Sequence, residues 1–464
     1  MIRLTLNDVL NGVGPHSLPY APQQDVTFTD VSNDSRLIGK GALFVALKAE
    51  RDGHDFIPDA YRKGARGVIA EKVVDLGNSL PESAKSDFAY IVVDNSLAAL
   101  QRLSEHWRDQ FKIQVIGVTG SIGKTSTKEM IASVLSRKFN VLKNEKNMNN
   151  EIGLPLSMLH LNSSHQKSVM EMGMYDAGEI ATLCRIAKPE IGVVTNVSHS
   201  HLERLGSIER IAQAKSELIE ALPDDGLAIL NGDESLVRQM TAKTRAKHVF
   251  YGTSPECDVR AKNIRIHGLD GISFELVTGD EIVKVKTPLL GRHSVYSCLA
   301  ATAVGLATGM SLEEIAEGLR ESPSTVRIQA LAGKNGAIII NDSYNASPVS
   351  TIAALDLLQR LRGRRIAILG DMFELGSYEE EGHRRVGQRA AKSVDKLIVV
   401  GKRARWIGEE AIRAGLKDVQ LVESNSAVVL DLQPDDFVLV KGSRGMRMEE
   451  VVAKLVAERE RGSR

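Results

Sequence analysis

Long hydrophobic runs and paired cysteines are both missing from this sequence. No run approaches the roughly 18 apolar residues that a membrane-spanning helix needs, and residues 1–8 lack the apolar core of a secretory signal peptide. The three cysteines, Cys184, Cys257 and Cys298, are far apart, which argues against a metal site or a disulfide framework. We therefore expect a cytoplasmic protein with no membrane insertion.

An excess of either charge is missing as well. Lysine plus arginine and aspartate plus glutamate both number 59, so the formal net charge is zero, and we expect no nucleic-acid partner. The 464 residues, 43% of them apolar and 25% charged, contain no internal repeat and no low-complexity tract. This composition is typical of a globular protein of two to four domains, and a monomer is the expected assembly.

The most distinctive stretch joins an apolar segment, residues 113–118, to a helical pattern over residues 125–139. Between them lies a glycine-spaced turn followed by Lys124 and Thr125. A strand, such a turn and a helix form a phosphate-binding loop, in which backbone N–H groups and the lysine hold phosphate and the threonine hydroxyl can bind Mg²⁺. The spacing departs from G-x-x-x-x-G-K-[ST], because Val118 stands at the first glycine. The alternative is an ordinary glycine-rich turn with a solvated lysine.

Alternating strand and helix patterns predict an α/β fold in three domains. A small N-terminal domain of short elements covers residues 1–110, and a central parallel-sheet domain with the phosphate loop covers residues 111–323. A Rossmann-like domain covers residues 324–464. It lacks G-x-G-x-x-G after its first strand, so dinucleotide binding is not expected.

Lys215 is an anomaly in the helix expected over residues 207–222, because it completes an apolar stripe that includes Ile211, Leu218 and Ile219. A lysine on such a face must extend its ammonium group to solvent, pair with a carboxylate, or change its chemistry. Extension to solvent is the simplest interpretation. The sharper hypothesis is a deprotonated lysine carbamylated by carbon dioxide, which would convert a cation into a metal ligand.

Two further residues follow neighbouring predicted strands. Glu171 ends the apolar strand at residues 168–172, and His201 lies just beyond the strand at residues 191–197. Each is weak evidence alone, since a loop histidine is usually solvated. Together with Thr125 and a modified Lys215 they can converge on Mg²⁺ beside a phosphate, because Mg²⁺ prefers oxygen ligands that include one or two carboxylates.

Seven motifs, in this order, resemble those of the Mur ligase family over essentially the whole chain. They are residues 34–36 (DSR), 52–54 (DGH), 119–126 (TGSIGKTS), 147–155 (NMNNEIGLP), 342–348 (DSYNASP), 370–376 (GDMFELG) and 440–446 (VKGSRGM). The resemblance accounts for the glycine spacing of the loop and implies the three-domain α/β fold. It implies an ATP-dependent amide ligase that uses Mg²⁺, with two ions expected. The substrates implied are UDP-N-acetylmuramoyl-tripeptide and D-alanyl-D-alanine, joined through an acyl phosphate.

The resemblance also implies roles for individual residues. Catalytic and metal-binding roles fall to Lys124, Glu171, His201, carbamylated Lys215 and, for the metal, Thr125. ATP binding is expected from Gly120, Ser121, Ile122, Gly123, Lys124, Thr125, Ser126, Ser297, Arg327, Asp342 and Asn345. Substrate binding is expected from Ser35, Arg36, Asp52, Gly53, His54, Asn149, Asn150, Lys441, Ser443 and Arg444.

The sequence departs from the family pattern at Ser294 and Ser297, where asparagine is usual. A serine hydroxyl cannot replace a two-sided amide, so the contact to adenine is open to question. Two alternatives remain: a related ligase that adds another amino acid, such as a folylpolyglutamate-type enzyme, and a nucleotide-binding regulatory protein without ligase activity.

Overall fold

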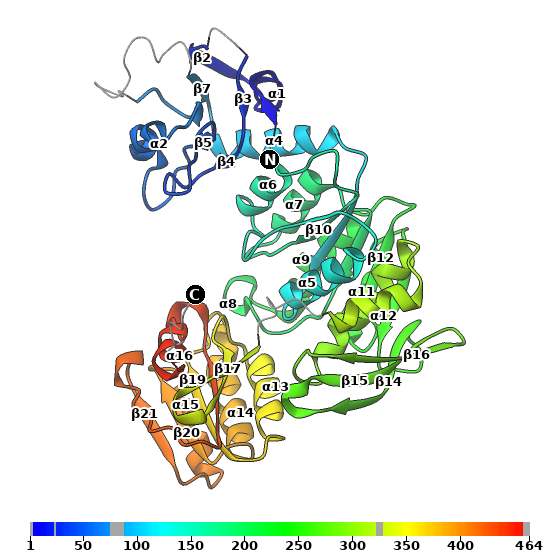
Figure 1. Ribbon diagram of the computed structural model, residues 1–464, viewed down its shortest axis with the longest axis vertical. Coiled ribbons are helices and arrows are strands. Elements are labelled where there is room, and N and C mark those ends of the chain that lie inside the picture. The colour runs from blue at the N-terminus through cyan, green and yellow to red at the C-terminus, as the bar shows by residue number, and fades with distance from the viewer. Residues whose placement is uncertain (1–2, 23–24, 75–87, 322–327, 458–464) are drawn as a thin grey trace, which may run out of the picture.

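A computed structural model describes residues 3–22, 25–74, 88–321 and 328–457. Each of three large sheets, flanked by helices, lies in its own region along an elongated molecule, with the N-terminal part at one end and the C-terminal part at the other (Figure 1). The predicted α/β class and three-domain architecture are confirmed. None of the helices in these residues is long and apolar enough to cross a bilayer.

The N-terminal sheet has five short strands in the order β2-β7-β6-β5-β4, and β1 pairs with β3 beside it. The strands are β1 (Leu4–Thr5), β2 (His16–Tyr20), β3 (Thr27–Phe28), β4 (Val31–Ser32), β5 (Leu43–Val45), β6 (Gly67–Ala70) and β7 (Ala89–Val93). The helices are α1 (Leu6–Gly12), α2 (Ile57–Arg62) and α4 (Ser96–Asp109).

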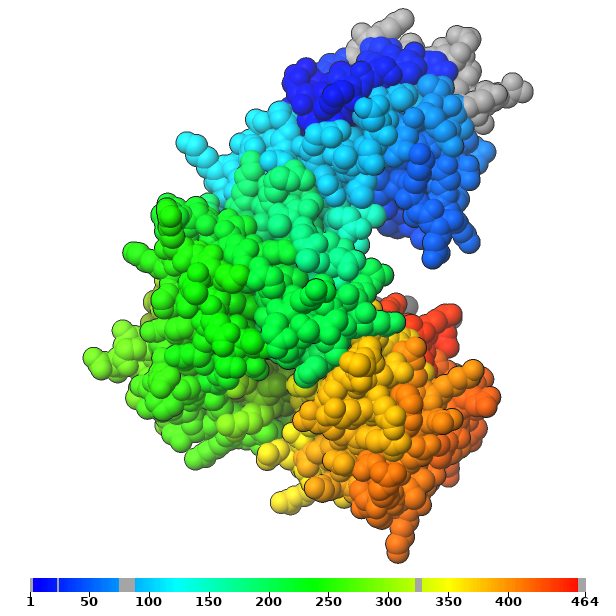
Figure 2. Space-filling view, turned by 180° about the vertical axis from the view of Figure 1, so that it is seen from behind, coloured from blue at the N-terminus to red at the C-terminus, as the bar shows by residue number. Residues whose placement is uncertain are grey.

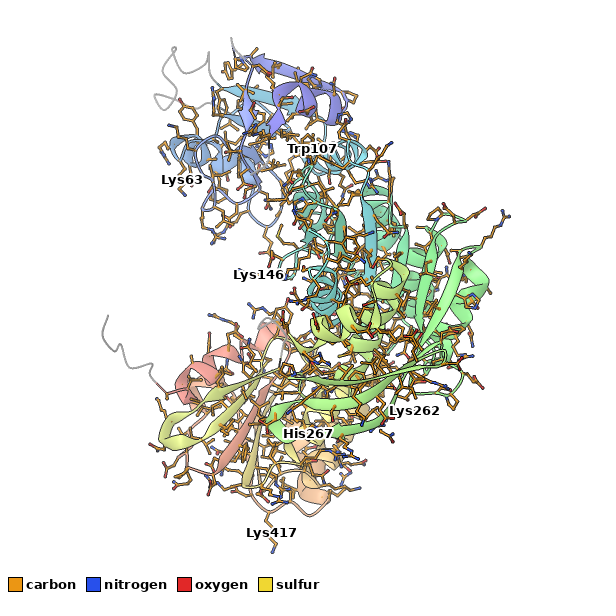
Figure 3. The ribbon with its side chains drawn as sticks, turned by 45° about the vertical axis from the view of Figure 1, so that its right-hand side comes forward. Lys63, Trp107, Lys146, Lys262, His267 and Lys417 are labelled. Atoms are coloured by element: carbon orange, nitrogen blue, oxygen red, sulfur yellow. The ribbon has the colours of Figure 1, made fainter. Side chains whose placement is uncertain are left out.

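Helix α4 joins this sheet to the central domain. The indole of Trp107 donates to the carbonyl of Leu161, 3.1 Å away, at the junction seen in Figure 3. The buried guanidinium of Arg108 donates to three carbonyls, those of Ala187, Phe111 and Ile113. One hydrophobic core therefore runs from the N-terminal sheet into one face of the central sheet.

The central sheet has nine strands in the order β16-β15-β14-β13-β12-β11-β8-β10-β9. The strands β9, β10, β8, β11, β12 and β13 and their neighbour β14 are mutually parallel. Strand β15 is antiparallel to both of its neighbours, β14 and β16. The strands of this sheet are β8 (Gln114–Thr119), β9 (Val141–Lys143), β10 (Lys167–Glu171), β11 (Ile191–Val194), β12 (Leu227–Asn231), β13 (Lys247–Gly252), β14 (Val259–Ile266), β15 (Ile272–Thr278) and β16 (Glu281–Thr287). The helices are α5 (Lys124–Leu135), α6 (Gly153–Met158), α7 (Glu179–Ala187), α8 (Leu202–Leu205), α9 (Ile208–Glu220), α10 (Ser235–Arg238), α11 (Ser294–Ala307) and α12 (Leu312–Arg320).

The C-terminal sheet has six strands in the order β17-β18-β22-β19-β20-β21, and only β17 is antiparallel to its neighbour. They are β17 (Gln329–Ala332), β18 (Ile338–Asp342), β19 (Arg364–Gly370), β20 (Lys396–Val400), β21 (Val419–Val422) and β22 (Asp436–Lys441). The helices are α13 (Pro348–Leu358), α14 (Glu379–Ala391), α15 (Arg405–Arg413) and α16 (Glu449–Leu455). Seen from behind, the molecule is hollowed between its N-terminal and C-terminal lobes (Figure 2).

The predicted elements around the phosphate loop are present. Helix α5 ends at Leu135 rather than at residue 139, because residues 136–139 form turns rather than further α-helix. Helix α9 begins after Ser207, whose hydroxyl accepts from the N–H of Arg210 as an N-cap. The edge strands β17 and β21 of the C-terminal sheet are short and only partly buried, so their sequences carry little strand signal.

Candidate functional site

The phosphate loop, residues 120–123, joins β8 to α5 at the carboxyl edge of the central sheet. Gly120 has φ 145°, and a side chain there would collide with Thr195. Gly123 has φ 82° and faces open space, so glycine is required by conformation rather than by crowding. Since the first N–H groups of a helix lack partners within it, an anion at this open rim would meet donors from α5.

Two residues just after β11 hold this loop. The side-chain amide of Asn196 accepts from the N–H of Ile122 at 2.9 Å and donates to its carbonyl at 2.8 Å. The hydroxyl of Thr195 donates to the same carbonyl at 2.7 Å. The sequence analysis missed both residues, although they are the first polar residues after a buried strand, where parallel-sheet sites form.

Lys124 is the first residue of α5 and folds back over the loop. Its Nζ donates to the carbonyls of Gly120 at 2.7 Å and Ser121 at 3.3 Å. The ammonium group is therefore held at the rim of the loop, beside the position that a bound phosphate would take.

Glu171 ends β10, directly beside Val118 of β8, and its side chain is 1% exposed. Its Oε1 accepts from the amide of Asn149 at 2.7 Å. Its Oε2 is buried and has no hydrogen-bond partner in the part of the chain that the structure describes. A buried oxygen of this kind at the edge of the phosphate loop fits a cation ligand, because leaving such an atom unpaired is costly.

Lys215 lies on α9 and is 1% exposed, so its ammonium group does not extend to solvent. Burial is the main reason that its pKa lies well below the usual lysine value, and the positive charge of Lys124 lowers the pKa further. The described residues provide no carboxylate that pairs with it. This buried position close to Lys124 thus favours the neutral form of the Lys215 amine.

His201 begins α8 in a left-handed conformation, with φ 63°. Its Nδ1 lies 2.6 Å from Oε2 of Glu374, in the C-terminal domain, although the two groups are not aligned as a hydrogen bond. This contact with His201 is the main reason that the pKa of Glu374 is lowered, and Lys124 contributes at longer range. Glu374 therefore reaches from the C-terminal domain to His201 in the central domain, a contact that the sequence analysis did not predict.

The loop beyond β11 contains two further buried hydroxyls. Those of Ser198 and Ser200 have no hydrogen bond among the described residues. The described part of the chain contains no group of three His, Cys, Asp or Glu side chains placed to hold a metal ion. A metal here would need the mixed set of a hydroxyl, Glu171 and a modified Lys215, which the unpaired Oε2 and the neutral amine fit.

The two serines that replace asparagine are both buried at the start of α11. Ser297 Oγ lies 3.0 Å from the hydroxyl of Thr127 on α5, and Ser294 donates to the carbonyl of Leu290 at 2.7 Å. Arg327, predicted to reach the phosphates, lies outside the described residues.

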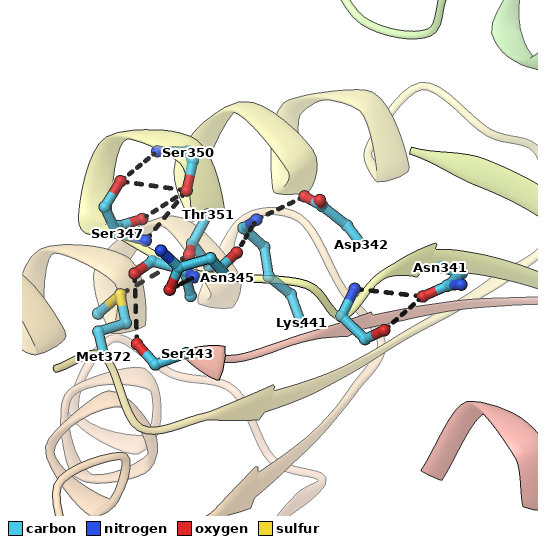
Figure 4. Close-up of polar contacts among 11 residues, drawn as sticks. Asn341, Asp342, Asn345, Ser347, Ser350, Thr351, Met372, Lys441 and Ser443 are labelled. Carbon is cyan, nitrogen blue, oxygen red and sulfur yellow. Dashed lines mark hydrogen bonds and ion pairs between the residues drawn. The ribbon is translucent and has the colours of Figure 1, made fainter. Parts of the chain in front are cut away.

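Four of the predicted residues of the C-terminal domain are brought together at the ends of β18 and β22 (Figure 4). Lys441 Nζ donates to Asp342 at 2.6 Å and to the carbonyl of Asn345 at 2.8 Å, and the ion pair is buried. Ser443 accepts from the N–H of Phe373 at 2.8 Å, which ties this cluster to the loop that carries Glu374.

Arg444 lies beside that cluster and is exposed. It pairs with Glu449 at 2.9 Å, and its guanidinium lies over the ring of Tyr344.

The predicted residues of the N-terminal domain form a separate set. Arg36 is exposed and pairs with Asp34, whereas the hydroxyl of the buried Ser35 donates to Asp59 at 2.8 Å. His54 is buried, with Nδ1 2.5 Å from Asp52 and Nε2 accepting from the N–H of Glu71. His54 therefore holds the loop, and its ring is not presented to a ligand in this conformation.

Two asparagines that were predicted to bind substrate form side-chain contacts within the central domain. Asn149 contacts Glu171, as described above, and the side chain of Asn150 accepts from the N–H of Gly153 at the start of α6. Lys146, in the same loop, points away from the central domain into the space between the lobes (Figure 3).

Three family models match successive parts of the chain. "Mur ligase family, catalytic domain" matches residues 27–108, "Mur ligase middle domain" residues 118–305, and "Mur ligase, glutamate ligase domain" residues 326–444. The UDP-N-acetylmuramoyl-tripeptide–D-alanyl-D-alanine ligase of Bacillus subtilis is 35% identical, covering 98% of this chain and 99% of that protein. The chain belongs to the Mur ligase family.

Solved structures of Mur ligases share this architecture. MurF from Acinetobacter baumannii superposes with a TM-score of 0.86 and 29% identity, covering 97% of this chain and 98% of that one. MurF from Thermotoga maritima, in complex with ADP, gives a TM-score of 0.76 and 29% identity, covering 91% and 96%. In the present Mur ligase, the phosphate loop, Glu171 and His201 follow the carboxyl ends of neighbouring strands of the central sheet, and the charge of Lys124 acts on the buried Lys215.

Proposed function

We propose that this Mur ligase joins D-alanyl-D-alanine to UDP-N-acetylmuramoyl-tripeptide, using ATP, in the synthesis of peptidoglycan precursors. The observation that carries the proposal is the position of Lys124, the unpaired Oε2 of Glu171 and the buried Lys215 around one phosphate loop. The relative from Bacillus subtilis named for this reaction matches the chain over nearly its full length, which supports the choice of substrates.

The chemistry is activation of a carboxylate. An oxygen of the terminal carboxylate of the tripeptide attacks the γ-phosphorus of ATP, and ADP leaves with the electron pair of the broken bond. The free amine of D-alanyl-D-alanine then attacks the acyl carbon, the amide forms, and phosphate leaves. Lys124 and the N–H groups of α5 stabilise the charge on the transferring phosphoryl group, so catalysis rests on positioning and electrostatics.

Magnesium is the proposed cofactor, as two ions. Thr125 and Glu171 would hold one ion, while His201 and Lys215, as a carbamate, would hold the other. Carbamylation requires a neutral lysine that attacks carbon dioxide and releases a proton, and the lowered pKa of the buried Lys215 favours that form. Bound Mg²⁺ would offset the negative charge of the phosphates.

The remaining predicted residues receive roles in binding. Asp342 and Asn345 are proposed for the ribose side of ATP, with Ser297 at the base and Arg327 at the phosphates. Ser35, Arg36 and the 52–54 loop are proposed for the uridine nucleotide. Asn149, Asn150, Lys441, Ser443 and Arg444 are proposed for the peptide substrates. Domains at residues 1–110, 111–323 and 324–464 would then separate the UDP handle, ATP and the incoming dipeptide.

A monomer in the cytoplasm is the proposed state. The proposal rests on the balanced charge of the chain and on the lack of a membrane-spanning helix among the described residues.

The test is phosphate release from ATP with UDP-N-acetylmuramoyl-tripeptide, with and without D-alanyl-D-alanine. We expect release to depend on the dipeptide and on the UDP substrate. Hydrolysis that does not require the dipeptide would contradict the proposed ligase and favour a nucleotide-driven regulatory protein.

The Lys124→Ala variant tests the phosphate loop within the same assay. We expect phosphate release to fall on the order of 1000-fold, because the cation beside the transferring phosphoryl group is lost. Binding of the UDP substrate, measured by calorimetry, should be unchanged. Turnover near the wild-type rate would show that this loop does not hold the reacting phosphate.

A further inference from the structure

Lys128 is a second fully buried lysine close to the site, and the proposed reaction does not use it. It lies on α5, four residues after Lys124, and is 0% exposed. Residues four apart lie on the same face of a helix, so one short helical segment carries both lysines. Because burying a charge is costly unless it is paired and hydrogen-bonded, Lys128 needs a structural reason.

The partners of Lys128 supply that reason. Its Nζ donates to the backbone carbonyl of Asn144 at 2.5 Å and lies 3.0 Å from Oε1 of the buried Glu129. Lys143 contacts the other oxygen of Glu129 at 2.5 Å. Burial alone would raise the pKa of Glu129, but the hydrogen bond from Lys143 and the charge of Lys128 outweigh it and lower the pKa. Glu129 is thus charged and balances the buried lysine.

Asn144 connects Lys128 to Glu171. It directly follows β9 and is 1% exposed. Its side-chain amide donates to the carbonyl of Glu171 at 2.9 Å, and its Oδ1 accepts from the N–H of Glu171 at 2.9 Å. The side chain of Asn144 therefore continues the pairing of β9 with β10 and fixes the backbone of Glu171 on both sides.

The carboxylate of Glu171 is then fixed by one further bond. Asn149 donates to Oε1, while Oε2 stays buried and unpaired. With its backbone held by Asn144 and Oε1 held by Asn149, Glu171 keeps only Oε2 for a further ligand, two residues along the neighbouring strand from the phosphate loop.

We propose that Lys128 is a positioning residue that holds Glu171, through Asn144, at a fixed place relative to the phosphate loop. The inference rests on the proposed function, because it takes Glu171 as a metal ligand. Helix α5 carries Lys124 at its first turn and Lys128 at its second. One rigid element thereby sets the distance between the phosphate-binding cation and the carboxylate that faces the same phosphate. A neutral apolar side chain could not donate to the carbonyl of Asn144.

Lys143 offers a matched control. It pairs with the same Glu129, but among the described residues its side chain forms no hydrogen bond with the backbone of Asn144 or with Glu171. The comparison of Lys128→Met with Lys143→Met thus separates loss of the bond to Asn144 from loss of an ion pair to Glu129.

The experiment measures Mn²⁺ binding to the full-length enzyme in the presence of ADP, by electron paramagnetic resonance of free Mn²⁺. We expect Lys128→Met to weaken Mn²⁺ binding about 10-fold, the usual effect of losing a residue that orients a ligand, and Lys143→Met to change it less than about 2-fold. The KM for the UDP substrate should stay at the wild-type value in both variants, whereas general damage to the fold would raise it.

Asn144→Ala is the second variant, used if Lys128→Met does not fold. It leaves Lys128 paired with Glu129 and removes the side-chain bonds of Asn144 to Glu171 together with its bond to the carbonyl of Met148. We expect the same loss of Mn²⁺ affinity. Wild-type Mn²⁺ binding in Lys128→Met or in Asn144→Ala would overturn the inference, as would an equal loss in Lys143→Met. A wild-type enzyme that releases phosphate without the dipeptide would instead contradict the proposed function, so the two failures are distinguishable.

Discussion

At the scale of the residue, Lys215 shows how an apolar stripe in the sequence points to a buried amine with altered chemistry. The apolar stripe predicted that this lysine faces inward, but it left extension to solvent as the simplest interpretation. The structure excludes that interpretation, since the side chain is 1% exposed and its pKa is strongly lowered by burial. A buried amine without a carboxylate partner among the described residues is the precondition for carbamylation, and the modification itself stays a prediction.

The Lys215→Ala variant tests whether Lys215 is carbamylated. We expect phosphate release to fall on the order of 100-fold or more, because the variant lacks the carboxylate-like ligand. Millimolar short carboxylic acids such as formate should restore part of the activity by occupying the vacated position.

The control is Lys243→Ala. Lys243 is exposed and pairs, at 3.3 Å, with Glu220, which lies on the same helix as Lys215. This variant should keep its activity and should not respond to added acid. A Lys215→Ala enzyme with wild-type activity would show that the lysine is structural.

At the scale of the element, the loop of residues 371–378 connects the C-terminal domain to the site. Buried His383 accepts from the N–H of Met372 at 3.0 Å, and Ser443 accepts from the N–H of Phe373. Glu374 follows in a left-handed conformation, φ 64°, opposite His201, which has φ 63°. Two uncommon backbone conformations that face each other across a domain boundary indicate a functional constraint rather than chance.

The rings beside this pair support the same contact. Tyr378 stacks on His199, with centroids 4.4 Å apart, and its hydroxyl accepts from Arg385 at 2.6 Å. The C-terminal domain therefore contacts the loop beyond β11 through an ion pair and an aromatic stack.

Glu374→Ala tests the role of this loop. We expect the Mg²⁺ concentration for half-maximal rate to rise about 10-fold, since carboxylates that contact a metal-binding histidine orient it and fix its tautomer. Titration of phosphate release against Mg²⁺ is the measurement. Glu381→Ala, at an exposed position of α14, is the control and should leave the titration unchanged. An identical shift in both variants would point to a general effect of surface charge.

At the scale of the whole molecule, the N-terminal and central domains are tied together by more than α4. His160, after α6, has Nε2 3.5 Å from Asp30 of the N-terminal domain. The hydrogen bond to Asp30 is the main reason that the pKa of His160 is raised, and the same contact lowers the pKa of Asp30. Both groups are nearly half exposed, so the pair contributes less than about 1 kcal/mol.

The sign of the pH dependence follows from the raised pKa of His160. A histidine with a raised pKa in the folded state stabilises the protein fully below its unfolded value of about 6.5, and this stability is lost as pH rises through the folded pKa. We expect His160→Gln to lower the urea midpoint slightly at pH 5.5 and to match the wild type at pH 8.5. Equal deficits at both pH values would assign the effect to packing instead.

The sequence by itself determined the fold class, the phosphate loop and the inward face of Lys215. These features are encoded locally, in glycine spacing, strand patterns and helical periodicity, and they depend on neighbours within about ten residues. It also singled out Glu171, because a carboxylate at the end of an apolar strand is conspicuous.

Only the tertiary structure decided which residues meet across long separations. The ring of His54 is buried between Asp52 and the backbone of Glu71. The amide of Asn149 holds Oε1 of Glu171, and the substrate roles of both residues stay predictions. Glu374 and Lys128 gave no local signal, because the partners that define them, His201 and Asn144, are brought to them by sheet order and domain packing. Periodicity reports the face on which a side chain lies, whereas its partner is set by the arrangement of the elements in space.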